Sequence, residues 1–229
     1  MGNYINKYTN EAAYLADDSK QYPNVSYIVS GDTVVYVKEN PANGLTVYYN
    51  VTSTEVDTRL FNGGGGSSSS SSEGESGGEC AVLPTRMLVD GVEETVIDTW
   101  RFSTTGEHTV KYFFEDNVIP ENFLYNAETI PATKVVVGDD FTEIGESAFF
   151  QTTISAATIS QSVWSIGDNA FNACYDLVSV TVNRQVPPTL GYSVFDNNAS
   201  GRKIYVPASA LEDYQSQWDE YANDIEAIQ

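Results

Sequence analysis

Few residues of this chain have the chemistry of a catalytic site. His108 is the single histidine, and it lies in the strand-like segment 106–112, where we expect a surface or edge-strand side chain. A nucleophilic Cys–His pair would need Cys80 or Cys174 beside it. Cys80 ends a flexible stretch, and Cys174 falls at a core position of a repeat, where a free thiol acts as a small hydrophobic group. We therefore expect no nucleophilic catalysis.

Acidic, phosphate-binding and metal-binding patterns are equally weak. The pairs Asp17-Asp18 and Asp139-Asp140 contain the carboxylates of a glycosidase, but adjacent strand residues point to opposite faces. The run Gly63–Gly66 lacks the lysine and the helix of a phosphate loop. The cysteines lack zinc-ligand spacing, and no segment has the spacing of an EF-hand loop. We expect no enzyme activity, no catalytic residues, no cofactor and no metal site.

The composition favours a protein that presents a surface. The 229 residues include 32 acidic and 11 basic side chains, a net charge of −21, which argues against nucleic-acid binding. We interpret the acidity as a source of solubility. No apolar run of about 18 residues predicts a membrane span. The 15 tyrosines suit a contact surface, because tyrosine combines rigid apolar area with a hydroxyl.

The elements that would position these residues are dominated by an internal repeat. Residues 141–149 (FTEIGESAF) and 163–171 (VWSIGDNAF) match at an offset of 22 residues. Strand-like segments recur with them at 135–137, 157–159 and 180–182. A fixed period of this length predicts stacked coils that cover one another's apolar faces.

Within each coil, the apolar side chains are expected to fill the interior. We expect Gly145 and Gly167 to permit a tight bend, and the small Ala148 and Ala170 to leave room for the next coil. The predicted repeat core consists of Ile144, Ala148, Phe149, Ile159, Ile166, Ala170, Phe171, Cys174, Leu177, Val180 and Phe195.

The end of the chain predicts a helix over 207–229 that covers the last coil. Ser209 and Glu212 have the spacing of a capping box. Apolar residues then recur every three or four positions, as on one helical face. The residues predicted to cap the solenoid are Ser209, Leu211, Tyr214, Trp218, Tyr221 and Ile225.

The remainder of the chain predicts short β-elements. We expect a hairpin from 25–29 and 34–38, preceded by a short helix starting at Asn10. Further strands are expected over 45–51, 82–89, 94–102 and 106–114. The Gly/Ser-rich segment 62–79 cannot bury enough apolar area to become ordered, so we expect a flexible loop.

These elements predict a mainly β protein with four parts. An N-terminal anchor segment with a hairpin covers 1–40, and a small antiparallel β module that contains the flexible loop covers 41–115. Stacked repeat coils follow over 116–206, and the capping helix ends the chain.

Residues 115–229 resemble the BspA-type leucine-rich repeat. The resemblance rests on Ile144-Gly-Glu-Ser-Ala-Phe149, on Ile166-Gly-Asp-Asn-Ala-Phe-Asn-Ala-Cys174, and on the closing segment that starts at Ile204. The segment 151–153 departs from the pattern because it lacks the usual Gly-Cys. The resemblance implies a repeat domain common in surface and secreted proteins of Bacteroides and its relatives.

The N-terminal segment is similar to leaders of virion proteins of crAss-like and other Bacteroides phages. The similarity rests on 4–8 (YINKY), 11–17 (EAAYLAD), 23–29 (PNVSYIV) and 33–36 (TVVY). It implies an anchor that docks on other virion components, the capsid or a fibre. The implied anchor contacts are Tyr4, Ile5, Tyr8, Tyr14 and Leu15.

Together the two resemblances imply a non-enzymatic phage structural protein, of the head-fibre or capsid-decoration type, located on the virion. Its repeat domain would face a host surface protein or a glycan. The N-terminus lacks the apolar region of a secretion signal, as expected of a virion protein made in the host cytoplasm. The alternative is a bacterial cell-surface adhesin module. The sequence leaves open whether the chain forms a homo-oligomer.

Overall fold

The computed structural model describes residues 43–62, 80, 82–125 and 131–229, together with the backbone of three strands nearer the N-terminus. The chain divides into two compact units, Met1–Asn43 and Gly44–Gln229. The predicted helix at Asn10, most of the loop 62–79 and four predicted anchor contacts (Tyr4, Tyr8, Tyr14 and Leu15) lie outside the described residues.

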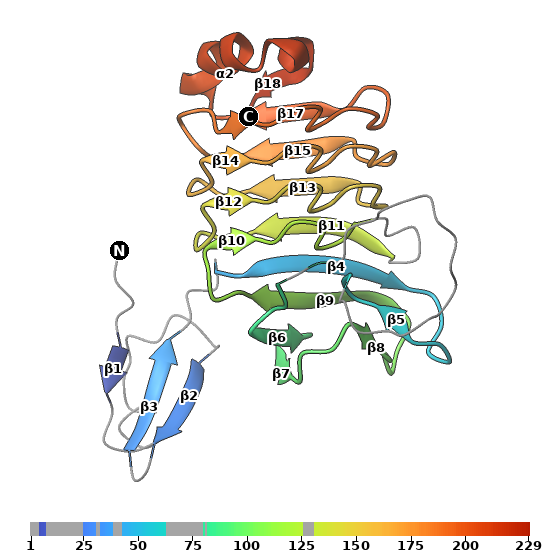
Figure 1. Ribbon diagram of the computed structural model, residues 1–229, viewed down its shortest axis with the longest axis vertical. Helices are drawn as coiled ribbons and strands as arrows, with labels where there is room; N and C mark the ends of the chain where they lie inside the picture. Colours follow the sequence, from blue (N-terminus) through green and yellow to red (C-terminus); the bar gives the residue numbers. More distant parts are fainter. Residues whose placement is uncertain are drawn as a thin grey trace. The chain divides into compact units, whose positions relative to one another are not determined.

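The N-terminal unit contains a three-stranded antiparallel sheet in the order β1-β3-β2 (Figure 1). Its strands are β1 (Ile5–Lys7), β2 (Val25–Ser30) and β3 (Thr33–Lys38). Ser30 pairs with Thr33, so the predicted hairpin is confirmed. The hairpin gains a third strand from β1, whose first residue, Ile5, is one of the predicted anchor contacts.

Within the described part of the second unit, a nine-stranded sheet runs in the order β18-β17-β15-β13-β11-β4-β9-β6-β7 (Figure 1). In chain order its strands are β4 (Leu45–Val51), β6 (Arg86–Val89), β7 (Val92–Glu94), β9 (Gly106–Phe113), β11 (Ala132–Val137), β13 (Ala156–Ile159), β15 (Ser179–Val182), β17 (Lys203–Val206) and β18 (Ile225–Ala227). The predicted mainly β fold class is confirmed.

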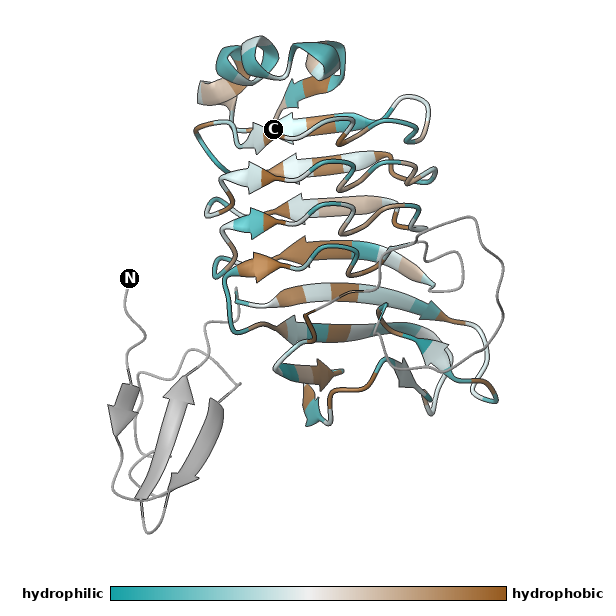
Figure 2. Cartoon of the chain, viewed as in Figure 1, coloured by the Kyte–Doolittle hydropathy of each residue, from teal (hydrophilic) through white to brown (hydrophobic). Residues whose placement is uncertain are grey.

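This sheet joins an antiparallel half to a parallel half. Strand β11 pairs antiparallel with β4, with Val135 opposite Val47, and parallel with β13. The segments 41–115 and 116–206 therefore share one sheet, and their apolar residues share one core. Figure 2 shows brown and paler bands alternating along β4 and β9, as expected of strands with one buried face.

Two smaller sheets lie in the described part of this unit. A parallel ladder links β10 (Val118–Ile119), β12 (Glu143–Ile144), β14 (Ser165–Ile166) and β16 (Thr189–Leu190), one short strand from each coil. Strand β5 (Thr58–Arg59) pairs antiparallel with β8 (Thr99–Trp100).

The long strand predicted over 94–102 is wrong. A turn at Asp90 and Gly91, which have φ angles of 49° and 82°, folds β7 back along β6. The chain then leaves the sheet after Glu94, and Val96 packs against the core from outside any strand. The predicted strand over 82–89 is likewise shorter, because pairing with β9 begins only at Arg86.

The glycines of the repeat serve close packing between coils rather than a bend. Neither Gly145 nor Gly167 has a positive φ, so our expected reason for them was wrong. A Cβ on Gly145 would lie 2.7 Å from the carbonyl oxygen of Ile119, and one on Gly167 would lie 2.7 Å from the backbone nitrogen of Glu146. Each glycine thus lets its coil approach the backbone of the preceding coil.

The bends are instead made by left-handed residues that recur in each coil. The first series consists of Asn122, Ser147, Asn169 and Ser193, with φ angles of 53° to 57°. The second series consists of Gln151, Ala173 and Asn197, with φ angles of 53° to 57°. Asparagine tolerates this conformation better than most residues, which is consistent with its recurrence at these turns.

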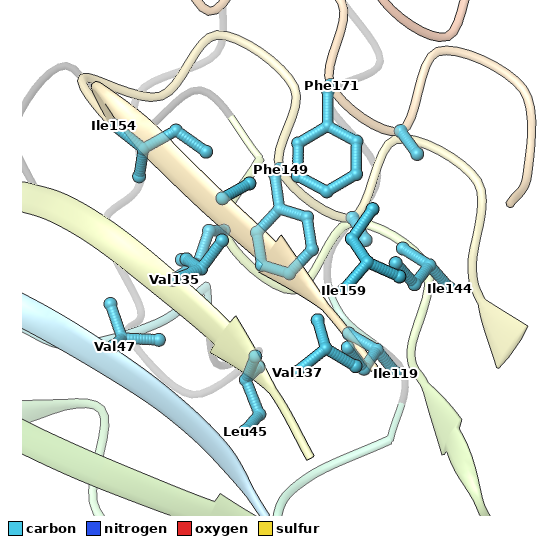
Figure 3. Close-up of a cluster of buried hydrophobic side chains, with 14 of the residues drawn as sticks. Leu45, Val47, Ile119, Val135, Val137, Ile144, Phe149, Ile154, Ile159 and Phe171 are labelled. Carbon is cyan, nitrogen blue, oxygen red and sulfur yellow. The ribbon is translucent and has the colours of Figure 1, made fainter. Parts of the chain in front are cut away.

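The coils stack through a column of aromatic rings. The ring centroids of Phe149 and Phe171 are 4.9 Å apart, and those of Phe171 and Phe195 are 5.5 Å apart. Figure 3 shows Phe149 and Phe171 beside aliphatic side chains of several strands. All eleven residues predicted for the repeat core are buried. Each fully buried Phe contributes roughly 1.5–3 kcal/mol relative to an exposed one.

The cap differs from the predicted continuous helix. It consists of a 3-10 turn (Ala208–Ala210), the seven-residue helix α2 (Leu211–Gln217), a second 3-10 segment (Asp219–Asp224) and β18. The capping box is wrong, because Ser209 lies inside the first turn and its hydroxyl contacts Gln185 at 2.7 Å.

The aromatic and apolar residues of the predicted stripe nevertheless cover the last coil. Tyr214, Trp218, Tyr221 and Ile225 are buried, and Leu211 is partly buried against the core. The indole N–H of Trp218 donates to the carbonyl oxygen of Pro188 at 3.0 Å. Strand β18 adds in parallel to β17, so the sheet itself extends into the cap (Figure 1).

Candidate binding surface

The single histidine is held within the sheet and is nearly buried. His108 lies on β9 between β4 and β6 with 9% exposure, so the predicted surface or edge-strand position is wrong. Its Nδ1 lies 2.7 Å from Asp90 Oδ2, and its Nε2 lies 2.9 Å from the carbonyl oxygen of Thr104. Both ring nitrogens are thus occupied by residues of the protein itself.

Burial and hydrogen bonding also suppress the reactivity of the two thiols. Cys80 and Cys174 are free and buried. The thiol of Cys174 donates to the carbonyl oxygen of Phe149 at 3.0 Å, and that of Cys80 donates to Val82 at 3.0 Å. Burial raises the pKa of both thiols, that of Cys174 to about 11. A thiolate nucleophile is therefore disfavoured at neutral pH.

The pair Asp139-Asp140 lies in the turn after β11, so our argument from strand geometry does not apply to it. Asp139 is exposed, whereas Asp140 is half-buried and accepts a 2.7 Å hydrogen bond from the N–H of Gly44. Burial raises the pKa of Asp140 above its ordinary value. This carboxylate fixes the start of β4 to the end of β11. The other pair, Asp17-Asp18, lies outside the described residues.

Two features are absent from the described part of the chain. No group of three or more His, Cys, Asp or Glu side chains there is placed to hold a metal ion. No helix there is long and apolar enough to cross a bilayer.

The broad surface of this unit is the outer face of the nine-stranded sheet. Strand pairing aligns its outward-facing side chains into two rows that cross β9, β4, β11, β13, β15 and β17. The first row consists of Thr109, Tyr48, Lys134, Ala156, Ser179 and Lys203. The second row consists of Lys111, Thr46, Val136, Thr158, Thr181 and Tyr205. We call these residues the outer rows.

The outer rows combine lysines, partly exposed tyrosines and small hydroxyl side chains. Lys134 Nζ lies 5.0 Å from the ring centroid of Tyr48, within the range of a cation–π contact. Lys203 Nζ lies 2.7 Å from Glu226 Oε1, and this ion pair raises the pKa of Lys203. Such a face can hold a ligand by charge, hydrogen bonding and stacking.

Comparison with known families gives one match. The BspA type Leucine rich repeat region matches residues 102–218 in six copies, just over half of the 229 residues. The chain belongs to the BspA-type leucine-rich repeat family. The BspA-type match begins within the segment that leads to β9, earlier than the predicted start at residue 115, and ends at Trp218 in the cap. No curated protein matches the chain.

Three successive BspA-type coils of this chain share a hydrogen-bonding position that the sequence pattern did not reveal, buried at Thr152 and Cys174 and half-buried at Asn198. Thr152, Cys174 and Asn198 occupy it in successive coils. The Cys174 thiol and the Asn198 amide donate to the carbonyl oxygens of Phe149 and Phe171 in the preceding coil, whereas the Thr152 hydroxyl donates to Phe149 in its own coil. Thr152 thus replaces the cysteine that the segment 151–153 lacks. The offset of 22 residues between Thr152 and Cys174 was the signal that could have identified it.

The outer rows were also missed by the sequence reasoning. The strands of the BspA-type coils alternate buried and outward-facing residues, and this alternation can be read from the sequence. Identifying the rows also requires knowledge of the register between strands. This register places Tyr48 beside Lys134, which is 86 residues away in the sequence. Sequence periodicity within one strand carries no information on that pairing.

Proposed function

We propose that this protein is a non-enzymatic structural protein of a phage particle that displays its BspA-type repeat domain to a host surface. In this proposal residues 1–40 attach the chain to the capsid or to a fibre. The unit Gly44–Gln229 then presents the outer rows to a host protein or glycan.

The observation that carries the binding role is the outer face of the sheet. A repeat domain of the BspA type is a surface module, and here it offers a sheet face with aligned, partly exposed lysine, tyrosine and hydroxyl side chains. The groups best suited to catalysis are held elsewhere in internal contacts, as shown by His108 and Cys174. The lysine, tyrosine and hydroxyl side chains of the sheet face are suited to binding a ligand.

The attachment role is supported by the N-terminal unit. Residues 1–43 cluster as a compact unit of their own, separate from the repeat domain. The same residues carry the resemblance to phage virion leaders, and Ile5, one of the implied anchor contacts, lies on β1. A separate unit can attach to a particle without using the repeat surface.

Deletion of residues 1–24 tests the attachment. Phage particles would be purified from cells that express either the full-length chain or residues 25–229, and the bound chain would be quantified by mass spectrometry. We expect the truncated chain to be lost from the particles, while its repeat domain unfolds at the same denaturant concentration as in the full-length chain. Equal incorporation of both chains would refute the anchor.

The family match itself favours one alternative, a bacterial cell-surface adhesin module. Fractionation of cells that produce the chain naturally separates the two functions. A virion protein co-purifies with DNA-filled particles on a density gradient, whereas an adhesin stays with the cell envelope in the absence of any particle.

A further inference from the structure

The charge of the outer rows is opposite to that of the chain as a whole. The chain has 32 acidic and 11 basic residues. The outer rows contain three lysines, at 111, 134 and 203, and no aspartate or glutamate. A positive strip on an acidic protein attracts an anionic group to that strip and repels it from most of the remaining surface.

Among the three lysines, Lys134 is the one best placed to meet a ligand. Lys203 is already paired with Glu226, and Lys111 is influenced electrostatically by Asp140. Within the described residues, no ion pair joins Lys134 to a carboxylate, and its neighbour on the outer face is the ring of Tyr48. The positively charged ammonium of Lys134 therefore lies beside an aromatic ring and can pair with an anionic group of a ligand.

The outer-row side chains between Lys134 and Lys203 are small. Ala156 and Ser179 separate Lys134 from Lys203 in the first row, and Thr158 and Thr181 lie beside them in the second row. Neighbouring strands are about 4.8 Å apart, so three steps place the two lysines about 14 Å from each other. An extended chain that crosses the strands can contact both lysines and the hydroxyl groups between them.

The side chains of this strip suit a sugar chain better than a protein. Large hydrophobic side chains that are strongly exposed, such as Trp164, Tyr175 and Tyr192, lie outside the outer rows. A protein interface needs buried aromatic or aliphatic anchors at its centre. The strip offers instead two partly exposed tyrosine rings, hydroxyl groups and lysine ammonium groups, which match sugar rings, their hydroxyls and carboxylates.

We propose that the outer rows bind a polysaccharide whose sugars carry carboxylate groups, with one carboxylate on Lys134 and one sugar ring on Tyr48. The next acidic sugars extend across β13 and β15 towards Lys203. This inference rests on the proposed binding function and specifies its ligand class.

The test is isothermal titration calorimetry of the full-length chain with three polyuronate oligosaccharides: oligogalacturonate, and the mannuronate and guluronate fragments of alginate. Methyl-esterified oligogalacturonate, which has the same backbone without the charge, is the ligand control. We expect at least one polyuronate to bind with an affinity that falls with added salt. We expect the esterified form of a binding galacturonate to bind at least tenfold more weakly.

Single substitutions test whether the polyuronate binds at Lys134. K134Q should weaken binding about tenfold, and K134R should restore most of the affinity. E226Q, which releases Lys203 from its ion pair, should strengthen binding. R101Q is the matched control, because Arg101 is exposed and paired with Asp57 outside the outer rows. Thermal unfolding of each variant establishes that the fold is intact.

Three results would overturn the inference. They are the absence of binding by all three polyuronates, equal loss of affinity in K134Q and R101Q, and equally tight binding of poly-glutamate, which would indicate an acidic protein partner. These measurements use the free chain in solution. Loss of glycan binding therefore leaves the particle-attachment experiment unaffected, and failure of attachment leaves the glycan result unaffected.

Discussion

Arg202 and Asp224 join the last coil to the terminal cap by a hydrogen-bonded ion pair of 2.6 Å between Nη2 and Oδ2. Arg202 is 7% exposed, and its guanidinium lies 5.6 Å from the ring of Phe195 and 5.1 Å from the ring of Tyr221. Its Nη1 also donates to Asn198 at 3.0 Å and to the carbonyl oxygen of Phe195. This side chain, just before β17, thus joins the last coil at Phe195 and Asn198 to the cap at Asp224.

Replacing Arg202 by alanine should therefore loosen the cap. We expect the free energy of unfolding to fall by about 3 kcal/mol, because a buried cation and its hydrogen bonds to carbonyl and carboxylate groups are lost together. Urea unfolding followed by tryptophan fluorescence measures the change, since Trp218 lies in the cap. R101Q, in an exposed ion pair, should leave the midpoint unchanged. Equal midpoints for R202A and R101Q would show that the pair does not hold the cap.

Gly145→Ala tests the close approach between coils. The added Cβ would lie 2.7 Å from backbone atoms of the preceding coil, so we expect a loss of at least about 2 kcal/mol in the free energy of unfolding. Gly201→Ala is the matched control, because its Cβ meets no atom within 4 Å although its φ is +81°. That strain should cost about 1–2 kcal/mol. A smaller effect at Gly145 than at Gly201 in denaturant titrations would contradict the packing role.

Asp90 should make stability depend on acidity below about pH 4. Burial acts to raise the pKa of this carboxyl, but hydrogen bonds from the N–H of Thr109 and from His108 hold it below its usual value. The stabilisation is therefore complete above the ordinary aspartate pKa and is lost as the pH falls through the lower folded-state pKa.

Asp90→Asn is a suitable probe, because asparagine tolerates the positive φ of 49° at this position. The variant should be less stable than the wild type at pH 5 to 7, and the difference should shrink towards pH 2. Thermal unfolding across this range measures it, with Asp57→Asn as an exposed control. A difference that stays constant down to pH 2 would show that the Asp90 carboxylate contributes nothing by its charge.

The buried pair Tyr49 and Tyr112 should behave cooperatively. Their hydroxyl oxygens are 2.6 Å apart, and they lie 2.6 and 3.1 Å from the carbonyl oxygen of Leu60. Either single change to phenylalanine leaves Leu60 one donor, so each should cost about 1 kcal/mol. The double variant leaves the carbonyl without a donor and should cost more than the sum. Strict additivity in a double-mutant cycle would contradict this sharing.

Both thiols should resist modification in the folded protein. Burial raises the pKa of Cys174 to about 11 and also raises that of Cys80. Iodoacetamide at pH 8 should therefore label neither residue within minutes, whereas both should react at once in urea. Peptide mass spectrometry distinguishes the two sites. Fast labelling of Cys174 without denaturant would show that the coil opens there.

The sequence by itself determined which residues form the coils. Ile144, Phe149 and their counterparts 22 positions later repeat the same apolar pattern, and burial follows because each coil must cover the apolar face of its neighbour. The mainly β class, the N-terminal hairpin and the aromatic cover of the last coil followed from the same local patterns.

Only the tertiary structure decided where side chains from different strands meet. Tyr48 and Lys134 lie together because β4 pairs antiparallel with β11. His108 is enclosed because Asp90, Phe102 and Thr104, from outside its own strand, contact its ring. The cap ends in β18 rather than in a helix because the unpaired edge of β17 offers backbone hydrogen bonds to it. Side-chain alternation is a local property of a strand, whereas strand partners and register are fixed by hydrogen bonds between segments distant in sequence.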